Sequence, residues 1–474
     1  MALQFDNSYL RDLPWAALRL APDAAPAPRL LAFNDDLAAR LGADPDDLRE
    51  TAAAWLSGAA LPPGADPAAL AYAGHQFGGF SPSLGDGRAH LLGEVIAPDG
   101  ARFDLQLKGS GRTPFSRGGD GKAAVGPMLR EYLISEAMAA LGAPTTRSLA
   151  VVATGEDILR DGRRLPGAVV ARIAASHIRV GSFQFFAARG EAERVRALAD
   201  HAIARHDPDL SGTEGRYLAF FDRVVARQAR LIAEWMGLGF IHGVMNTDNM
   251  AVSGETIDYG PCAFMEGYAP GTVFSSIDRQ GRYAWQNQPL ILGWNLARLA
   301  EAIYPLFDAN PETGVAIAND RLDRIAGQYQ AEWLAVMRAK LGLSGQDAGD
   351  QALVDDLLAA MPGADWTLTF HRLAEAATGD LSRLRPLFDD FTAMDAWLPR
   401  WQARGPDATR MRRANPAVIP RNHRVEEALD AATAGDLAQF TALLAAVRAP
   451  FTPDEAYMLP APAGFGRYVT FCGT

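Results

Sequence analysis

The chain has 474 residues, of which 49% are hydrophobic and 21% charged, a composition typical of a folded globular protein. It carries 45 Lys and Arg against 56 Asp and Glu, and the net charge of -11 disfavours binding of nucleic acid by general electrostatic attraction. Its two cysteines exclude a disulfide framework and a four-cysteine zinc site. The start of the chain lacks a signal-peptide pattern and no stretch is apolar enough to span a bilayer, so we expect a cytoplasmic protein without a membrane partner.

The order of hydrophobic patterns predicts an α+β fold, with a sheet region followed by a helical region. Residues 1–71 mix short helical pieces with proline-rich breaks, and we interpret them as an N-terminal extension. Residues 72–188 contain short β-branched runs around one helical segment, which predicts a small, mostly antiparallel sheet carrying one helix. Residues 189–305 begin with strong helical periodicity and continue into loops, and residues 306–474 are expected to form a helical C-terminal extension.

A lysine and a glutamate in the predicted sheet region form the first candidate pair. Lys108 ends the alternating run 102–109, and Glu131 lies near the start of the predicted helix 125–142. Protein kinases use a strand lysine held by a helix glutamate to bind nucleotide phosphates. The alternative is an ordinary solvated lysine at the end of a strand.

The segment 242–260 carries the strongest functional signal. Kinases have a loop that begins with His and ends with a metal-binding Asn, followed by a turn whose Asp binds the metal that bridges the phosphates. His242, Asn249 and Asp258 fall in this register, and a hairpin is predicted for residues 250–260 between them. Oxygen ligands on separate elements suit a hard cation, so we expect Asn249 and Asp258 to bind Mg²⁺ or Mn²⁺. The alternative is an ordinary polar turn.

The same segment departs from kinases at one position. Val244 stands where a kinase has its catalytic aspartate, and valine cannot accept a proton, so ordinary γ-phosphoryl transfer is disfavoured. Asp248 is the nearby carboxylate and is our candidate for the general base. His75, His177 and His242 lack the spacing of a zinc site, and we expect each to hydrogen-bond to backbone.

Long ungapped segments of the chain resemble the selenoprotein O family, also called YdiU. They extend from about residue 72 to the C-terminus and include YAGHQFGGFSPSLGDGRA, LQLKGSGRTPFSRGGDGKA, LREYLISEAM, ARIAASHIRVGSFQFF, HGVMNTDNM, IDYGPCAFM, NPAVIPRNHRVEEAL and FCGT. Members of this family have a protein-kinase-like fold and transfer AMP from ATP to protein hydroxyl groups. The resemblance therefore implies a bilobal fold, with the N-lobe in residues 72–188 and the C-lobe in residues 189–305.

The resemblance also implies the residues of an ATP site. Gly85, Gly87 and Arg88 would form a glycine-rich loop over the nucleotide, where backbone N–H groups can approach phosphate oxygens. The remaining implied contacts are Lys108 with Glu131 as its partner, Asp120, Gly121, Arg172, Arg179 and Asp258. The two arginines would hold the γ-phosphate because ATP is flipped relative to kinases, so that the α-phosphate faces the acceptor. Outside this context the glycine sequences would be ordinary turns.

The implied function is protein adenylylation, in which AMP is transferred to Ser, Thr or Tyr and pyrophosphate is released, with ATP as substrate and Mg²⁺ or Mn²⁺ as cofactor. A protein kinase is the alternative enzyme and is disfavoured by Val244. An inactive ATP-binding scaffold is the alternative from another class, and the complete Lys, Glu, Asn and Asp set argues against it. We expect a monomer that acts on protein substrates, with redox-related proteins and the enzyme itself as candidate targets.

The two cysteines form the last candidate site. Cys262 lies two residues after the 258–260 turn, and Cys472 is close to the C-terminus, where eukaryotic relatives carry selenocysteine. We expect them to form a disulfide under oxidising conditions that alters access to the site. The alternative is a pair of unrelated reduced thiols.

Overall fold

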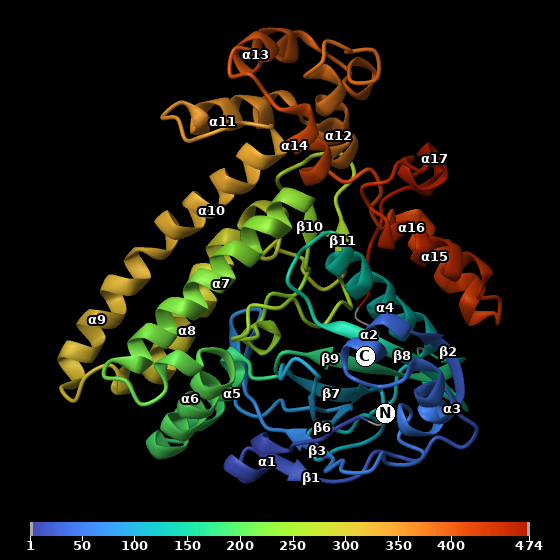
Figure 1. Ribbon diagram of the computed structural model, residues 1–474, viewed down its shortest axis with the longest axis vertical. Coiled ribbons are helices and arrows are strands. Elements are labelled where there is room, and N and C mark those ends of the chain that lie inside the picture. Colours follow the sequence, from blue (N-terminus) through green and yellow to red (C-terminus); the bar gives the residue numbers. More distant parts are fainter. Residues whose placement is uncertain (1–2, 161, 472–474) are drawn as a thin grey trace.

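The computed structural model describes residues 3–160 and 162–471 and has the predicted α+β architecture (Figure 1). A seven-stranded sheet occupies one end of the molecule, and long helices extend from it toward the other end (Figure 1). Within the described ranges, every helix is too short or too polar to cross a membrane.

The sheet has the strand order β1-β3-β6-β7-β9-β8-β2, and all neighbouring strands are antiparallel. Its strands are β1 (Ala17–Arg19), β2 (Arg29–Phe33), β3 (Ala68–Leu70), β6 (Ala89–Ile96), β7 (Arg102–Lys108), β8 (Arg147–Arg160) and β9 (Arg163–Ala174). The first 71 residues thus supply both edges of the sheet, together with α1 (Ser8–Asp12), α2 (Asp35–Arg40) and α3 (Pro45–Trp55).

Each face of the sheet packs against a different set of helices. Side chains alternate between the two faces of a strand, so Leu91 and Val170 belong to one hydrophobic cluster while the adjacent Leu92 and Val169 belong to the other. The first cluster contains the apolar residues of α4 (Val125–Ala140), and the second contains those of α2 and α3. The sheet is therefore covered on both sides, and α4 is held against β8 and β9.

The helical region is built around α7 (Arg216–Leu238), whose apolar stripe is buried and whose C-cap is Gly239 with φ 70°. It packs against α8 (Gln288–Ile303) and α10 (Ile325–Lys340). The other helices are α5 (Val180–Ala187), α6 (Ala192–His206), α9 (Pro311–Asp323), α11 (Asp350–Ala360), α12 (Trp366–Ala376), α13 (Thr392–Gln402), α14 (Ala408–Ala414), α15 (Asn422–Thr433), α16 (Ala438–Arg448) and α17 (Glu455–Met458).

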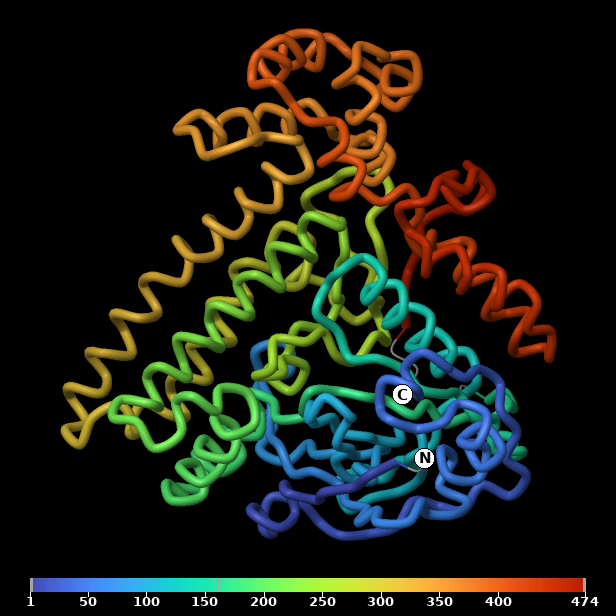
Figure 2. Tube along the Cα trace, in the orientation of Figure 1, coloured from blue at the N-terminus to red at the C-terminus, as the bar shows by residue number. Residues whose placement is uncertain are grey.

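The C-terminal part of the chain returns to the sheet region. Helices α15 and α16 pack against α4, and the tail after α17 then runs back toward the middle of the molecule (Figure 2). Thr470 donates hydrogen bonds from its N–H to the Phe274 carbonyl (2.8 Å) and from its hydroxyl to the Pro261 carbonyl (2.7 Å). The tail therefore contacts the segment that follows Asp258.

The loops that follow α7 differ from the prediction in one respect. β10 (Phe240–Ile241) pairs with β11 (Ala263–Phe264), but residues 250–260 between them do not form the predicted hairpin. Ala251 instead bridges to Arg179, and Thr256 bridges to Thr145. The hairpin prediction is wrong because the backbone groups of this segment pair with the sheet side of the molecule instead of with each other.

Candidate active site

A cavity of about 540 Å³ lies between the sheet and the loops that follow α7, a volume in the usual range for a small-molecule site. Its lining includes all the residues that sequence reasoning assigned to ATP, metal and base: Gly85, Gly87, Arg88, Lys108, Asp120, Gly121, Arg172, Arg179, Asp248, Asn249 and Asp258. Glu131 adjoins this group through Lys108. The fold thus brings together residues that are widely separated in the sequence.

Lys108 is held between two carboxylates. It is the last residue of β7, and its Nζ lies 2.6 Å from Oε2 of Glu131 in α4 and 2.5 Å from Oδ1 of Asp258. The predicted contact between strand lysine and helix glutamate is present. Because β7 is a central strand of the sheet and α4 packs on that sheet against β8 and β9, the ammonium group has a fixed position at the cavity wall.

Asp258 is surrounded by cations. Besides Lys108, Arg172 contacts its Oδ1 at 2.7 Å and Arg179 contacts its Oδ2 at 2.9 Å. Burial opposes ionisation of Asp258, but the charges of these three cations outweigh it and hold the pKa of the carboxyl well below its usual value. Asp258 also has φ 67°, a left-handed conformation that is unusual for a residue with a side chain.

Three cations form one wall of the cavity. Lys108, Arg172 and Arg179 contact the carboxylates of Glu131 and Asp258, and Arg179 also lies 3.9 Å from the carboxylate of Asp86. Both arginines are almost fully buried, so their charges are poorly screened by solvent. Guanidinium and ammonium groups of this kind are suitable partners for phosphate oxygens.

Asp248 presents a carboxylate with one unpaired oxygen. Its Oδ1 is buried and accepts no hydrogen bond within the described chain, whereas Gln76 Nε2 lies 3.4 Å from Oδ2. Burial raises the pKa of Asp248 to about 6. Gly74 makes this position possible, because a Cβ there would stand 2.3 Å from Oδ1. Arg179 donates to the Asp248 backbone carbonyl (2.5 Å), which links the base candidate to the arginine cluster.

Asn249 offers an oxygen ligand near Asp258. Its Nδ2 donates to the Val244 carbonyl (3.0 Å), and this bond determines which end of the amide carries Oδ1. The described chain contains no group of three His, Cys, Asp or Glu side chains that could hold a metal by itself. Mg²⁺ is commonly bound by one or two protein oxygens with phosphates and water completing the shell, so Asn249 and Asp258 fit such an ion.

The predicted glycine loop is packed against a second loop. Gly85 has φ 62°, and a Cβ there would lie 2.2 Å from the Phe115 ring. Gly121 has φ 72°, and a Cβ there would lie 2.0 Å from the Gly111 carbonyl oxygen. These positions therefore require glycine for backbone conformation and for close packing. Asp120 at the cavity edge forms a two-point ion pair with Arg160, at 2.8 Å for each contact.

The sequence analysis did not select Asp86, which lies between the two glycines of the loop. Its Oδ2 accepts hydrogen bonds from Leu70 N–H (3.1 Å) and Gln106 Nε2 (2.9 Å), and Arg179 lies 3.9 Å from Oδ1. Burial raises its pKa to about 6. Asp86 therefore connects the glycine loop to strands β3 and β7. The only signal in the sequence was a charged residue inside a glycine turn, a position usually exposed to solvent.

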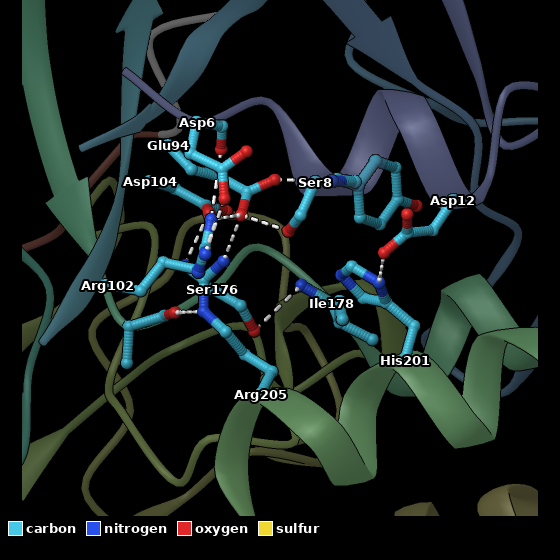
Figure 3. Close-up of polar contacts among 12 residues, drawn as sticks. Asp6, Ser8, Asp12, Glu94, Arg102, Asp104, Ser176, Ile178, His201 and Arg205 are labelled. Atoms are coloured by element: carbon cyan, nitrogen blue, oxygen red, sulfur yellow. Dashed lines mark hydrogen bonds and ion pairs between the residues drawn. The ribbon is translucent and has the colours of Figure 1, made fainter. Parts of the chain in front are cut away.

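The loop between Arg172 and Arg179 is held by buried ion pairs (Figure 3). Arg205 of α6 donates to the Ala175 carbonyl (2.8 Å) and pairs with Glu94 (2.7 Å) and Asp104 (2.8 Å). Asp104 also accepts hydrogen bonds from the backbone N–H and the ring Nδ1 of His177, at 2.8 and 2.9 Å. This network gives the two cavity arginines a rigid backbone support on the side away from the cavity.

The histidines have structural contacts. His242 Nε2 lies 2.8 Å from the Ile257 carbonyl, as expected for a loop histidine bonded to backbone. The rings of His75 and His177 instead contact the side chains of Gln184 and Asp104, so the expectation of backbone bonding was wrong for these two rings. Side-chain partners from distant segments replace the backbone carbonyls.

Cys262 is buried, and its thiol donates to the Tyr259 carbonyl (3.3 Å). Burial raises the pKa of this thiol to about 11, which keeps it protonated at neutral pH. Cys472 lies outside the described residues, so its predicted disulfide with Cys262 stays a prediction.

Comparisons with known proteins identify the family of this chain. The family model described as protein adenylyltransferase SelO matches residues 1–448. The chain is 63% identical, over the full length of both proteins, to the protein nucleotidyltransferase YdiU of Cereibacter sphaeroides. It is 56% identical to the protein of the same name from Mycolicibacterium paratuberculosis, covering 100% of this chain and 98% of the relative, and 55% identical to that of Methylorubrum populi, covering 99% of each. The resemblance found in the sequence is confirmed, and the chain belongs to the SelO family of protein adenylyltransferases.

Proposed function

We propose that this protein transfers AMP from ATP to Ser, Thr or Tyr hydroxyl groups of proteins and releases pyrophosphate. The observation that carries the proposal is the contact of Lys108 with both Glu131 and Asp258, next to Asn249, in a cavity whose kinase base position holds Val244. In this proposal the fold is bilobal and kinase-like, with an N-lobe in residues 72–188 and a C-lobe in residues 189–305. Residues 1–71 and 306–474 are its extensions.

Asn249 and Asp258 would hold Mg²⁺ or Mn²⁺ against the phosphates of ATP. When bound, the ion supplies positive charge that offsets the charge of the phosphates. Lys108, oriented by Glu131, would bind phosphate oxygens from the sheet side. Gly85, Gly87, Arg88, Asp120 and Gly121 would contact the nucleotide at the outer wall of the cavity, as the family resemblance implies.

Arg172 and Arg179 would bind the terminal phosphate of ATP. Their buried guanidinium groups have fixed positions and match the oxygens of a phosphate in two-point geometry. In the flipped orientation that the family resemblance implies, the α-phosphate would face the acceptor hydroxyl group. The arginines would then also neutralise the charge that develops on pyrophosphate as it leaves.

Asp248 would act as the general base. Its pKa of about 6 leaves the carboxylate ionised at neutral pH and still basic enough to accept a proton from a hydroxyl group. The acceptor oxygen attacks the α-phosphorus, its proton passes to Asp248, and the bond between the α-phosphorus and the bridging oxygen breaks. The products are the AMP ester of the protein and pyrophosphate.

Labelled ATP tests this proposal directly. The protein incubated with α-labelled ATP, Mg²⁺ or Mn²⁺ and a mixture of bacterial proteins should transfer label to proteins, itself among them, and γ-labelled ATP should transfer none. Asp248→Asn should bind ATP as the wild type does and lose transfer. Label from the γ-position would instead identify a kinase, and ATP binding without any transfer would identify a scaffold.

A monomer in the cytoplasm is part of the same proposal, with redox-related proteins among its substrates. Size-exclusion chromatography with light scattering tests the monomer, and identification of labelled proteins by mass spectrometry tests the substrates.

A further inference from the structure

An exposed surface rich in aromatic residues adjoins the rim of the cavity. We name it the acceptor face and define it by Phe77, Phe80, Ile277, Arg282, Leu290 and Trp294. Phe77 and Ile277 line the cavity itself and are 37% and 53% exposed. Phe80 is 43% exposed and lies across the β4–β5 hairpin (Gly74–Gln76 and Gly79–Ser81) from His75, whose ring contacts Trp294. The surface is therefore continuous from the cavity to α8.

Helix α8 extends this apolar surface. Leu290 is 73% exposed and lies four residues before Trp294, so both side chains occupy one face of the helix. A group of exposed large apolar side chains beside a cavity is typical of an interaction site rather than of ordinary protein surface.

The turn of the hairpin holds an aromatic residue in an unfavourable conformation. Phe77 has φ 51° and Gly78 has φ 87°, and the left-handed conformation is unfavourable for a residue with a Cβ. The conformation is maintained because the Phe77 N–H donates to Asn246 Oδ1 (3.1 Å) and to the Tyr283 hydroxyl (3.2 Å). Strained residues of this kind concentrate at functional sites, and here the strain places an aromatic side chain at the cavity rim.

Arg282 gives the acceptor face a positive charge without a matching carboxylate. Its guanidinium group lies 4.8 Å from the centre of the Trp294 ring and also contacts the side chain of Tyr283, and none of the described carboxylates forms an ion pair with it. Its Nε is buried and has no hydrogen-bond partner. Arg298, on the same tryptophan at 5.0 Å, differs because it pairs with Glu301. Arg282 is thus the cation of this surface that is available for an external anion.

We propose that the acceptor face binds the segment of a protein substrate that carries the reacting hydroxyl group, and that Arg282 pairs with an acidic residue of that segment. This inference rests on the proposed function. The substrate must reach Asp248 from the cavity rim, and Phe77 and Ile277 lie on that path. Aromatic side chains and arginine dominate the binding energy of protein interfaces, and an acidic segment complements a guanidinium group that has no carboxylate partner among the described residues.

Peptides test the charge preference. Each peptide would contain one Thr flanked by Leu and Phe. The remaining positions would be varied one at a time, with Glu, Gln or Lys at the varied position. Transfer from α-labelled ATP is then measured for each peptide. The wild type should prefer Glu over Lys at one or more positions by about tenfold in kcat/KM, and Arg282→Glu should reverse that preference.

A second variant tests the apolar part. Phe80→Ala should raise KM for all peptides by about tenfold and leave KM for ATP unchanged. Phe451→Ala is the matched control, because Phe451 is 38% exposed and lies outside the acceptor face. Melting temperatures of all three variants should match that of the wild type.

Three outcomes overturn the acceptor face: a wild type that labels itself but none of the peptides, a wild type without charge preference, or an Arg282→Glu variant that retains the wild-type preference. A wild type that binds ATP and transfers no α-label to any peptide or protein overturns the proposed function instead.

Discussion

The cavity and the helical region at the far end of the molecule are stabilised in different ways. The cavity wall consists of buried charges, in which Lys108, Arg172 and Arg179 surround Asp258. The helical region has fully buried tryptophans, and Trp397 and Trp401 stack at 5.3 Å between ring centres. Removing one partner of a buried charge pair leaves the other uncompensated, whereas removing an aromatic ring leaves a void. Substitutions in the cavity should therefore affect activity first, and substitutions among the tryptophans should affect stability first.

The largest effect is expected for Asp258→Asn. This change retains the volume of the side chain but removes the charge that three cations share, together with a proposed metal ligand. Transfer of α-label should fall by about 10³-fold or more, because phosphoryl chemistry depends on electrostatic stabilisation at this point. Asp323→Asn, an exposed residue, is the matched control and should retain wild-type activity. Activity within tenfold of the wild type would contradict the role of Asp258.

Trp401→Ala should destabilise the helical region. The ring is fully buried, stacks on Trp397, and donates from Nε1 to the Leu341 carbonyl (2.9 Å). The free energy of unfolding should fall by about 3–5 kcal/mol, measured by chemical denaturation. The kcat of the folded fraction at low temperature should stay within twofold of the wild type. Trp401→Phe should lose less stability because it retains most of the ring. A large loss of kcat without loss of stability would remove the contrast between the two regions.

A smaller effect is expected for Glu131→Gln. Lys108 retains Asp258 at 2.5 Å, so the lysine stays near its position while losing one of its two carboxylate partners. We expect kcat/KM for ATP to fall by about tenfold, and Lys108→Met to reduce it by about 10²-fold. The double variant should resemble Lys108→Met alone, because residues in direct contact are not additive. Additive losses would show that Glu131 acts on ATP independently of the lysine.

The sequence predicted the parts of this molecule that local patterns encode. The alternation in 102–109 and the helical spacing in 125–142 correspond to β7 and α4, and the motif around Asn249 and Asp258 led to the cavity. Strands of three residues at the sheet edge, such as Ala17–Arg19, are too short to produce a periodic signal. The hairpin prediction for 250–260 failed because its pairing partners are distant in the sequence.

The sequence analysis also did not predict the buried polar networks. Arg205 pairs with Glu94 and Asp104, more than 100 residues earlier in the chain, and each of these residues would be interpreted as a surface charge from its neighbours alone. Asp86 is hidden in the same way between two glycines of a turn. The sequence therefore identified residues that carry recognisable chemistry, and it did not identify residues that hold them in place through long-range contacts.

The smallest effect concerns a buried charge in the helical region. Lys340, the last residue of α10, is buried, and its Nζ lies 4.2 Å from the centre of the Phe370 ring. No carboxylate of the described residues forms an ion pair with it, and burial lowers the pKa of its ammonium group to about 7. In the unfolded chain the pKa is near 10.5, so between pH 7 and 10.5 the unfolded state binds more protons than the folded state. As the pH rises through that range, the free energy of unfolding of the wild type therefore increases relative to that of a variant without this lysine.

Lys340→Met removes the charge and retains the length of the side chain. At pH 6 the variant should melt about 2–4 °C higher than the wild type, because folding no longer buries an ammonium group. The difference should shrink as the pH rises from 7 to 9.5, where the folded wild type holds a neutral amine. Differential scanning fluorimetry across this range measures both effects, with Arg412→Met as an exposed control whose difference from the wild type should not vary with pH. A constant difference for Lys340→Met would mean that the amine stays charged in the fold. The helical region would then accommodate a buried cation through the contact of Lys340 with Phe370. In that respect the helical region would resemble the cavity, where buried charges also occur.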